Sequence, residues 1–202
     1  MTGKNDPAQI RLTELLTLLP QLEEEEETLN SRLIGRYLNA TPDSVRKDIS
    51  RLNREGRSGA YEGKDLSEGI RELLGLEGKK KVCLAGLGSL GLHIMELLEN
   101  SEHVELVAAF DSKMNRVERT DATVELFPAW EIPEITARYG VEAGIIATEP
   151  EDAEKTLNRM SEGGVRGILN LSGWYLPRDE EGPSIKNVNI GAMLLELLCR
   201  MK

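Results

Sequence analysis

A glycine-rich turn between an apolar strand and a helix restricts the fold of this 202-residue chain more than any other feature. Residues 82–91 read VCLAGLGSLG. A GxGxxG spacing in this context is typical of dinucleotide binding. The first glycine permits a tight turn, the second lets the backbone approach a pyrophosphate, and the third brings the helix close to the strand. The helix N-terminus also offers amide N–H groups to phosphates. We expect contacts from Gly86, Leu87, Gly88, Ser89, Leu90 and Gly91.

An acidic residue ends the next apolar segment. VELVAAFD closes on Asp111, 20 residues after Gly91, where the fingerprint places the carboxylate that binds the ribose 2′-hydroxyl. A carboxylate there repels a 2′-phosphate, so the sequence predicts NADH/NAD+ rather than the phosphorylated cofactor. Lys113 and Arg116 follow closely and weaken that preference. Ser112 and Lys113 are included in the predicted binding loop.

Strands and helices alternate from residue 78 to residue 188, which is the pattern of a parallel sheet covered on both faces. The carboxyl ends of such strands line the cofactor crevice, so Thr148, Glu149 and Pro150 are expected beside the nicotinamide-side ribose. Further candidates near the nicotinamide are Asn170, Ser172 and Trp174. The predicted strands are 82–87, 104–110, 123–126, 143–148, 167–170 and 184–188, and the predicted helices are 90–98, 128–139, 150–162 and 191–201.

Residues 1–77 carry a helical pattern instead. A first helix has one broad apolar face, and a second, 30–38, is followed by the turn NAT. A third helix is predicted over 42–55, with Thr41 as its N-cap and Pro42 in its first position. Two short helices with a tight turn, the second one basic, are typical of a helix-turn-helix, and a further helix is predicted over 66–76. The apolar face of the first helix is formed by Ile10, Leu12, Leu15, Leu16, Leu18 and Leu19.

The distribution of charge agrees with that interpretation. The chain has a formal charge of −10, which alone argues against nucleic acid, but residues 31–57 hold seven basic and three acidic residues. A local basic face binds phosphate even on an acidic protein, because salt screens charges beyond about 10 Å. GRSGAYEG, starting at residue 56, has the glycines of a tight β-turn and suits the wing of a winged helix. The predicted DNA contacts are Thr41, Ser44, Arg46, Lys47, Ser50, Arg51 and Arg57.

Composition excludes several classes of protein. Hydrophobic residues make up 40% of the chain, too many for a disordered protein, and the apolar stretches are shorter than the ~18 residues a membrane span needs. The first residues lack the apolar core of a signal peptide. Cys83 and Cys199 lie far apart in apolar segments, which predicts two reduced core thiols and a cytoplasmic location.

The residues that hydride-transfer catalysis needs are missing from the sequence. His93 and His103 fall in positions typical of structural histidines, and no Tyr-x-x-x-Lys pair occurs. A dehydrogenase normally has a second domain for its substrate, whereas here the second domain is a basic helix-turn-helix. We therefore predict that the protein is not an enzyme and that the dinucleotide is a signal.

The combination of motifs resembles the Rex family of bacterial redox-sensing transcriptional repressors. The resemblance rests on SVRKDISRLNREG, on GLGSLG with VAAFD, and on GVRGILNLS followed by NVN before a terminal helix. It implies a homodimer that binds palindromic double-stranded operator DNA, senses NADH/NAD+, exchanges its C-terminal helix between subunits and leaves the operator when NADH binds. Arg46, Lys47 and Ser50 match the recognition helix, Arg57 the wing, and the three glycines with Asp111 the nucleotide site.

Some positions depart from the pattern of that family. The wing is one residue shorter, Asn189 replaces an acid, Ile190 replaces an aromatic residue, and Thr17 stands where the family has an arginine. The shorter wing bears on its DNA contacts, whereas Thr17, Asn189 and Ile190 stand at positions of the family's redox switch, so an altered response to NADH is one expectation.

The sequence thus predicts an α/β protein. An N-terminal winged helix-turn-helix (1–77) precedes a Rossmann-like doubly wound parallel sheet (78–188) and a C-terminal dimerisation helix (189–202). Three alternatives stay open: an NAD-dependent oxidoreductase with a fused helical domain, a nucleotide-binding interaction protein that has lost DNA binding, and a domain that binds CoA or another nucleotide. The position of Asp111 disfavours the third.

Overall fold

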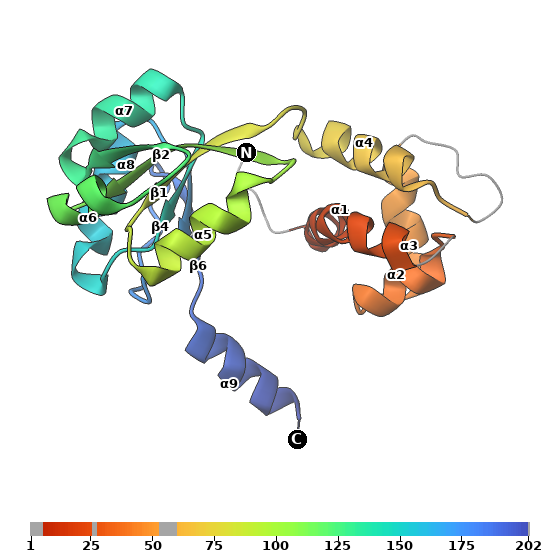
Figure 1. The fold of residues 1–202 in the computed structure, drawn as a ribbon. Helices are drawn as coiled ribbons and strands as arrows, with labels where there is room; N and C mark the ends of the chain where they lie inside the picture. The colour runs from red at the N-terminus through yellow and green to blue at the C-terminus, as the bar shows by residue number, and fades with distance from the viewer. Residues whose placement is uncertain (1–5, 26–27, 53–59, 202) are drawn as a thin grey trace. The chain divides into compact units, whose positions relative to one another are not determined.

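The computed structural model describes residues 6–25, 28–52 and 60–201 and separates into two units, Met1–Gly78 and Lys79–Lys202 (Figure 1). The first unit is helical. Its apolar core joins leucines of the long first helix to residues from every later helix, and an antiparallel bridge links Leu29 to Tyr61. Its elements are α1 (Pro7–Glu25), α2 (Ser31–Tyr37), α3 (Pro42–Ile49), the 3-10 helix η1 (Ser50–Leu52) and α4 (Gly63–Leu74).

Local chemistry explains the two short helices. The Asn30 side chain accepts hydrogen bonds from two backbone N–H groups at the start of α2, and Thr41 does the same for the Ser44 N–H in α3. Asn39, with φ 48°, makes the left-handed turn between them. A side chain on Gly35 would place its Cβ 2.5 Å from the Ala40 carbonyl oxygen, so the turn packs directly on α2. The predicted helix-turn-helix is therefore formed.

Several details of this unit differ from the prediction. The α-helical part of α3 ends at Ile49 and continues as η1 to Leu52; the predicted extension to residue 55 and the wing with Arg57 lie outside the described residues. Ile10 is exposed rather than buried, because the buried face of α1 is formed by Ala8, Leu12, Leu15, Leu16, Leu19 and Leu22. Leu18 is only partly buried against that core.

The second unit contains a six-stranded parallel sheet in the order β3-β2-β1-β4-β5-β6. The order reverses between β1 and β4, which is the point where ligands bind in doubly wound sheets. The strands are β1 (Lys80–Ala85), β2 (Val104–Asp111), β3 (Glu125–Pro128), β4 (Ala143–Ile146), β5 (Gly167–Asn170) and β6 (Ser184–Asn187).

Helices cover both faces of this sheet (Figure 1). Leu84 and Ala109 pack towards α5 and α6, whereas Cys83 and Phe110 pack towards α7 and α8, because side chains alternate along a strand. The fold class predicted from the sequence is confirmed. The helical elements are α5 (Ser89–Glu99), α6 (Met114–Arg119), η2 (Ala129–Glu131), α7 (Ile132–Tyr139), η3 (Pro150–Asp152), α8 (Ala153–Glu162) and α9 (Ile190–Arg200).

The helix α6 was not predicted. Its sequence, MNRVER, has too few apolar residues to show helical periodicity, and none of its residues is buried. It places Arg116 beside the end of β2, which matters for the site described below. The other elements agree with the predicted ranges to within a few residues.

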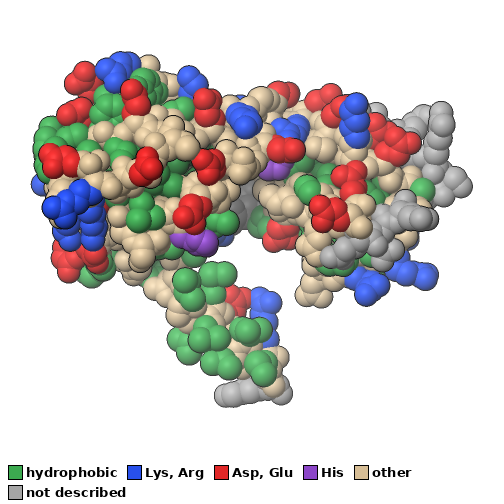
Figure 2. Space-filling model, viewed as in Figure 1, with side chains coloured by type: hydrophobic (Ala, Val, Ile, Leu, Met, Phe, Trp, Pro, Cys, Tyr) green, Lys and Arg blue, Asp and Glu red, His purple; other side chains and the backbone are tan. Residues whose placement is uncertain are grey.

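The C-terminal helix α9 buries no residue within its own chain. Its hydrophobic side chains gather on the surface that Figure 2 shows, and Cys199 is exposed, contrary to the prediction of a core thiol. Within the described ranges no helix has the length and apolarity to cross a membrane, and no group of metal-ligating side chains is found there. The exposed large apolar residues of α9 and its C-cap are Ile190, Met193, Leu194, Leu195, Leu197, Leu198 and Met201.

Candidate functional site

The glycine loop begins where β1 ends, at the point where the strand order reverses. The Gly86 N–H donates to the Phe110 carbonyl at 2.7 Å, and the Ala147 N–H donates to the Ala85 carbonyl at 2.8 Å. Gly86 has φ 106°, and a Cβ there would lie 2.4 Å from the Ala147 carbonyl oxygen. Only glycine fits this position, because the backbone is in a region that favours glycine and the next strand end is too close.

The other two glycines of the loop have different surroundings. A Cβ on Gly91 would lie 1.8 Å from the Gly86 carbonyl oxygen, so this glycine lets α5 approach the loop. A Cβ on Gly88 would meet only an Arg116 guanidinium nitrogen, at 3.9 Å. The space above Gly88 is therefore open to a ligand, as the pyrophosphate of a dinucleotide requires.

Asp111 ties the end of β2 to this loop. One carboxylate oxygen accepts the Leu87 N–H at 2.7 Å and an Arg116 N–H at 3.3 Å, and the other accepts the Lys113 N–H at 2.7 Å. The residue is only 4% exposed. The carboxylate therefore positions both loops and is itself paired with a cation.

A cavity of about 200 Å³ opens beside the glycine loop. Two cations from β2–α6 and two from α8 reach it, and Trp130 adds an aromatic surface. The lining residues are Ala85, Gly86, Gly88, Phe110, Asp111, Ser112, Lys113, Arg116, Ala129, Trp130, Ala147, Thr148, Glu149, Asp152, Lys155, Thr156 and Arg159.

A buried hydroxyl in the cavity lining lacks a partner. The Oγ1 atom of Thr148, at the end of β4, is buried and makes no hydrogen bond within the described residues. Leaving such a group unpaired costs about 1–3 kcal/mol, so the position suits a ligand that supplies a hydrogen bond. Together with the open Gly88 and the cations, Thr148 makes this cavity fit a dinucleotide.

Only some of the predicted nucleotide contacts line the cavity. Leu87, Ser89, Leu90, Gly91 and Pro150 do not; Leu87 and Gly91 act instead in the packing of the loop. Sequence reasoning missed Trp130, Asp152, Lys155 and Arg159 as lining residues. The spacing of Lys155 and Arg159, one turn apart on the helix that follows β4, was the available signal. The predicted residues that do line it are Gly86, Gly88, Asp111, Ser112, Lys113, Thr148 and Glu149.

The residues after β5 form a structural network. The Asn170 side chain donates to the Trp174 carbonyl at 2.6 Å and to the Asn187 side-chain oxygen at 2.7 Å, and it accepts the Ser172 hydroxyl at 2.7 Å. Asn170 is 1% exposed, and these residues are absent from the cavity lining. The structure thus assigns Asn170 and Ser172 to holding the loop, not to the cavity.

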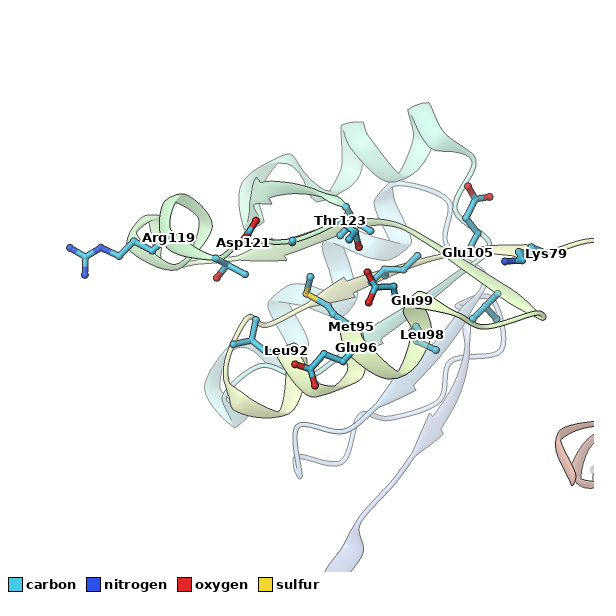
Figure 3. A pocket seen from close by; sticks show the side chains of 15 residues that line it. Lys79, Leu92, Met95, Glu96, Leu98, Glu99, Glu105, Arg119, Asp121 and Thr123 are labelled. Carbon is cyan, nitrogen blue, oxygen red and sulfur yellow. The ribbon is translucent and has the colours of Figure 1, made fainter. Parts of the chain in front are cut away.

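A larger cavity of about 720 Å³ lies between α5, β2 and the segment that connects α6 to β3 (Figure 3). It contains no residue of the glycine loop. Its charged side chains are mainly acidic, namely Glu96, Glu99, Glu105 and Asp121 against Lys79 and Arg119. Because this balance repels phosphates, the smaller cavity is the better nucleotide site.

In the helical unit, α3 presents the polar residues predicted to contact DNA. Val45 and Ile49 are buried, so Arg46, Lys47 and Ser50 stay exposed. The N-terminus of α3 is tightly organised, since the hydroxyls of Thr41 and Ser44 lie 2.9 Å apart.

The basic residues on the exposed side of α3 and η1 differ in their contacts with other side chains. Arg46 donates to the Ser31 hydroxyl at 2.9 Å and pairs with Asp43, and Arg51 pairs with Asp6 at 3.0 Å. Lys47 makes no ion pair with any described residue. These contacts fix the side chains of Arg46 and Arg51, whereas the side chain of Lys47 is free to bind a phosphate.

Arg11 of α1 fixes the orientation of α3 from the buried side. Its guanidinium donates to both oxygens of Asp48, at 2.7 and 3.1 Å, and Asp48 is 4% exposed. Hydrogen bonding to Asp48 raises the pKa of Arg11 above its usual value. Hydrogen bonds from the Ala8 N–H and from Arg51 lower the pKa of Asp6. The two ion pairs thus join α1 to α3 and Asp6 to η1.

Two positions that depart from the family resemblance have local roles. The Asn189 side chain caps α9 by accepting the Ala192 N–H at 3.0 Å, as an acid would. The Thr17 hydroxyl donates to the Glu14 carbonyl at 2.9 Å within α1.

Comparisons with known proteins match both units of the chain. The family model described as a CoA binding domain matches residues 77–173. The redox-sensing transcriptional repressor Rex of Rhodopirellula baltica is 31% identical over 180 residues, covering 88% of this chain and 75% of that protein. RSP, a Rex-family repressor, has a crystal structure that matches all of this chain and 96% of its own, with a TM-score of 0.77 and 22% identity.

RSP has also been crystallised with ligands. Its structure with NADH matches all of this chain and 95% of its own at 20% identity with a TM-score of 0.78. Its structure with NAD+ and operator DNA matches all of this chain and 94% of its own, at 20% identity with a TM-score of 0.82. The similarity to the Rhodopirellula repressor over most of both sequences establishes that this chain belongs to the Rex family of redox-sensing transcriptional repressors.

Proposed function

We propose that this protein is a repressor that binds palindromic operator DNA through residues 1–77 and is released from it by NADH bound in residues 78–188. The observation that carries the proposal is the unpartnered, buried Thr148 hydroxyl beside the open Gly88 loop, in a chain that also holds a helix-turn-helix. A relative, RSP, has been crystallised with NADH and with NAD+ and operator DNA. The location of such a repressor is the cytoplasm.

The DNA contacts come from the exposed face of α3. Lys47 and Arg46 bind phosphates or base edges in the major groove, and Ser50, whose hydroxyl donates to the Lys47 carbonyl at 2.8 Å, adds an acceptor oxygen. Thr41 and Ser44 at the N-terminus of α3 approach the backbone, where the helix N-terminus favours phosphate. Arg51 supports this face through Asp6, and Arg57 serves the wing in our proposal.

The nucleotide binds across the glycine loop. Gly86 and Gly88 accommodate the pyrophosphate, Thr148 and Glu149 bind the polar groups of the neighbouring ribose, and the loop Asp111–Lys113 binds the adenosine ribose. Leu87, Ser89, Leu90, Gly91 and Pro150 hold the shape of the loops in this account. The cofactor is a signal, and no hydride transfer to a substrate is part of the proposal.

The chain acts as a homodimer, with residues 189–202 as the dimerisation helix. Six large apolar side chains of α9 and that of its C-cap Met201 are between 49% and 79% exposed in the single chain. An exposed apolar surface of this kind marks a protein contact. A symmetric dimer presents two recognition helices to two half-sites of a palindrome.

The proposal is tested by fluorescence anisotropy of a labelled Rex-type palindrome at fixed, moderate salt, with increasing protein and then increasing NADH. We expect binding to the palindrome, weaker binding to a scrambled duplex, and release by NADH in the wild type but not in Gly88→Leu. Binding that is equal for both duplexes would contradict operator recognition. Release of Gly88→Leu by NADH would contradict the assigned nucleotide site.

The dimer is tested separately by sedimentation of the double variant Leu194→Glu, Leu198→Glu. We expect a monomer with much weaker operator binding, because the charges disrupt the apolar face of α9. Glu196→Gln is the matched control on the same helix and should stay dimeric. A double variant that remains dimeric would exclude α9 as the interface.

A further inference from the structure

We propose that Asp43, on the exposed side of α3, determines operator specificity by accepting a hydrogen bond from the amino group of a cytosine, with Arg46 beside it on the paired guanine. The inference rests on the proposed binding of DNA by α3 and names a base pair that this helix recognises. Asp43 is absent from the DNA contacts that the sequence predicts, all of which are basic or hydroxyl side chains.

Asp43 lies on the side of α3 that points away from the core. Val45 and Ile49 are buried, and residues two positions apart on a helix lie about 200° apart around its axis. Asp43 and Lys47 therefore occupy the opposite, exposed side, and the Asp43 side chain is 87% exposed. Asp43 also belongs to the first turn of α3, and a recognition helix contacts base edges with its N-terminal residues. Its position is thus one from which a base can be reached.

Arg46 holds the Asp43 carboxylate from one side. Its guanidinium donates to one oxygen of Asp43 and to the Ser31 hydroxyl, the latter at 2.9 Å. Ser31 is buried at the start of α2, so Arg46 is tied to the fold as well as to the acid. The second carboxylate oxygen of Asp43 accepts no hydrogen bond from any residue that the structure describes. The pair therefore presents one unused acceptor beside the N–H donors that remain on a guanidinium.

A carboxylate at this position has few favourable partners on DNA. The phosphates repel it, and in the major groove the bases offer hydrogen-bond donors only at the amino groups of cytosine and adenine. In adenine the amino group lies beside the N7 acceptor, which repels a carboxylate, whereas cytosine presents its amino group without a neighbouring acceptor. Thymine and guanine present acceptors to the groove. Cytosine is therefore the base that matches Asp43.

The same base pair suits Arg46. The guanine that pairs with this cytosine presents O6 and N7, the acceptors that arginine binds in the commonest specific contact with DNA. The acceptor of Asp43 and the donors of Arg46, side by side on α3, thus match the donor of cytosine and the acceptors of guanine on one base-pair edge. An exposed ion pair contributes little to stability, so either side chain can be replaced without unfolding the helical unit.

The experiment measures the base preference at each position of a Rex-type palindrome, changed symmetrically in both half-sites, one base pair at a time. Fluorescence anisotropy at fixed salt gives dissociation constants for the full-length wild type, Asp43→Ala and Asp43→Asn. We expect one position at which the wild type binds the C·G pair about tenfold more tightly than the other pairs. In Asp43→Ala that preference should fall severalfold, while the other positions keep theirs. In Asp43→Asn it should shift towards A·T, because asparagine binds N6 and N7 of adenine.

A role of Asp43 through its charge alone would give a different result. Both variants would then bind every duplex more tightly by the same factor, and unchanged base preferences in both would overturn this inference alone. Equal binding of the wild type to the palindrome and to a scrambled duplex would overturn the proposed operator recognition as well. Glu24→Gln removes an exposed acid near the end of α1 and should leave every preference unchanged. The melting temperature of each variant shows whether its fold is intact.

Discussion

The Asp111 carboxylate accepts the backbone N–H of Leu87 at 2.7 Å, and this bond joins the end of β2 to the middle of the glycine loop. A second bond, from the Lys113 N–H, holds the loop that follows β2. One buried side chain therefore positions both segments that surround the nucleotide cavity.

Replacing Asp111 should cost stability and binding together. In Asp111→Ala, two backbone donors and Arg116 lose their acceptor, so the free energy of unfolding should fall by about 2–4 kcal/mol. Urea unfolding measures the loss, and nucleotide titration should show weaker binding. Asp111→Asn keeps one acceptor oxygen and should lose less stability. Equal stability of Asp111→Ala and the wild type would show that the bonds are not formed in solution.

Substitutions at two glycines of the loop should have different effects, one on nucleotide binding and the other on thermal stability. Gly88→Leu fills open space and should abolish nucleotide binding with little change in melting temperature. Gly91→Ala places a Cβ 1.8 Å from the Gly86 carbonyl oxygen and should lower the melting temperature by several degrees. Nucleotide titration and thermal unfolding of both variants check this contrast. Retained binding in Gly88→Leu would contradict the position of the pyrophosphate.

The sequence could predict the role of a site residue only where the residues concerned lie close together in the chain. Gly86, Gly88 and Asp111 lie in one strand-turn-helix-strand segment whose spacing reveals the site. Lys155 and Arg159 come from a helix that reaches the cavity only through the order of the strands, which no short pattern encodes. The helix α6 escaped prediction because its six residues bury no side chain.

In the first unit, too, the sequence predicted features that depend on neighbouring residues and not those that depend on tertiary contacts. The roles of Thr41 and Pro42 at the start of α3 were predicted correctly because helix caps depend on neighbouring residues. The exposure of Ile10 depends on which helices pack against α1, and that of Cys199 on α9 lying away from its own core. Tertiary contacts decided these outcomes.

The pair of Arg11 and Asp48 should be a major contribution to the stability of the helix-turn-helix. Arg11→Ala leaves a buried carboxylate without its partner and should lower the free energy of unfolding by about 2–3 kcal/mol. The double variant Arg11→Met, Asp48→Leu removes both charges and should be more stable than Arg11→Ala. Urea unfolding compares the three proteins. A double variant less stable than Arg11→Ala would contradict the cost of the unpaired Asp48 carboxylate.

Lys47 should bind a DNA phosphate without stabilising the fold. Lys47→Ala should weaken operator binding and reduce the slope of log affinity against log salt by about 1. Lys186→Ala, an exposed cation in the other unit, is the control for net charge. Titrations over a range of salt concentrations give the slopes, and an identical slope in Lys47→Ala would remove this residue from the interface.

Cys83 should resist modification and make the fold sensitive to alkaline pH. Burial raises the pKa of its thiol from 9.0 to about 12. The unfolded thiol releases its proton between these values and the folded thiol does not, so stability falls as pH rises through this range. The decline should be shallower in Cys83→Ala, by up to about 1.4 kcal/mol per pH unit. Urea unfolding from pH 8 to pH 10 measures it, and identical declines would contradict the burial.

The central claim is that nucleotide and operator binding are coupled within one dimer. Coupling is reciprocal, so a nucleotide that releases DNA must itself bind more weakly to the DNA-bound protein, by the same factor. The most direct measurement is therefore a titration of NADH against the free protein and against the protein saturated with a Rex-type palindrome, at one salt concentration. The account predicts an affinity about tenfold lower in the presence of DNA. Equal affinity for NADH in the two states would contradict it.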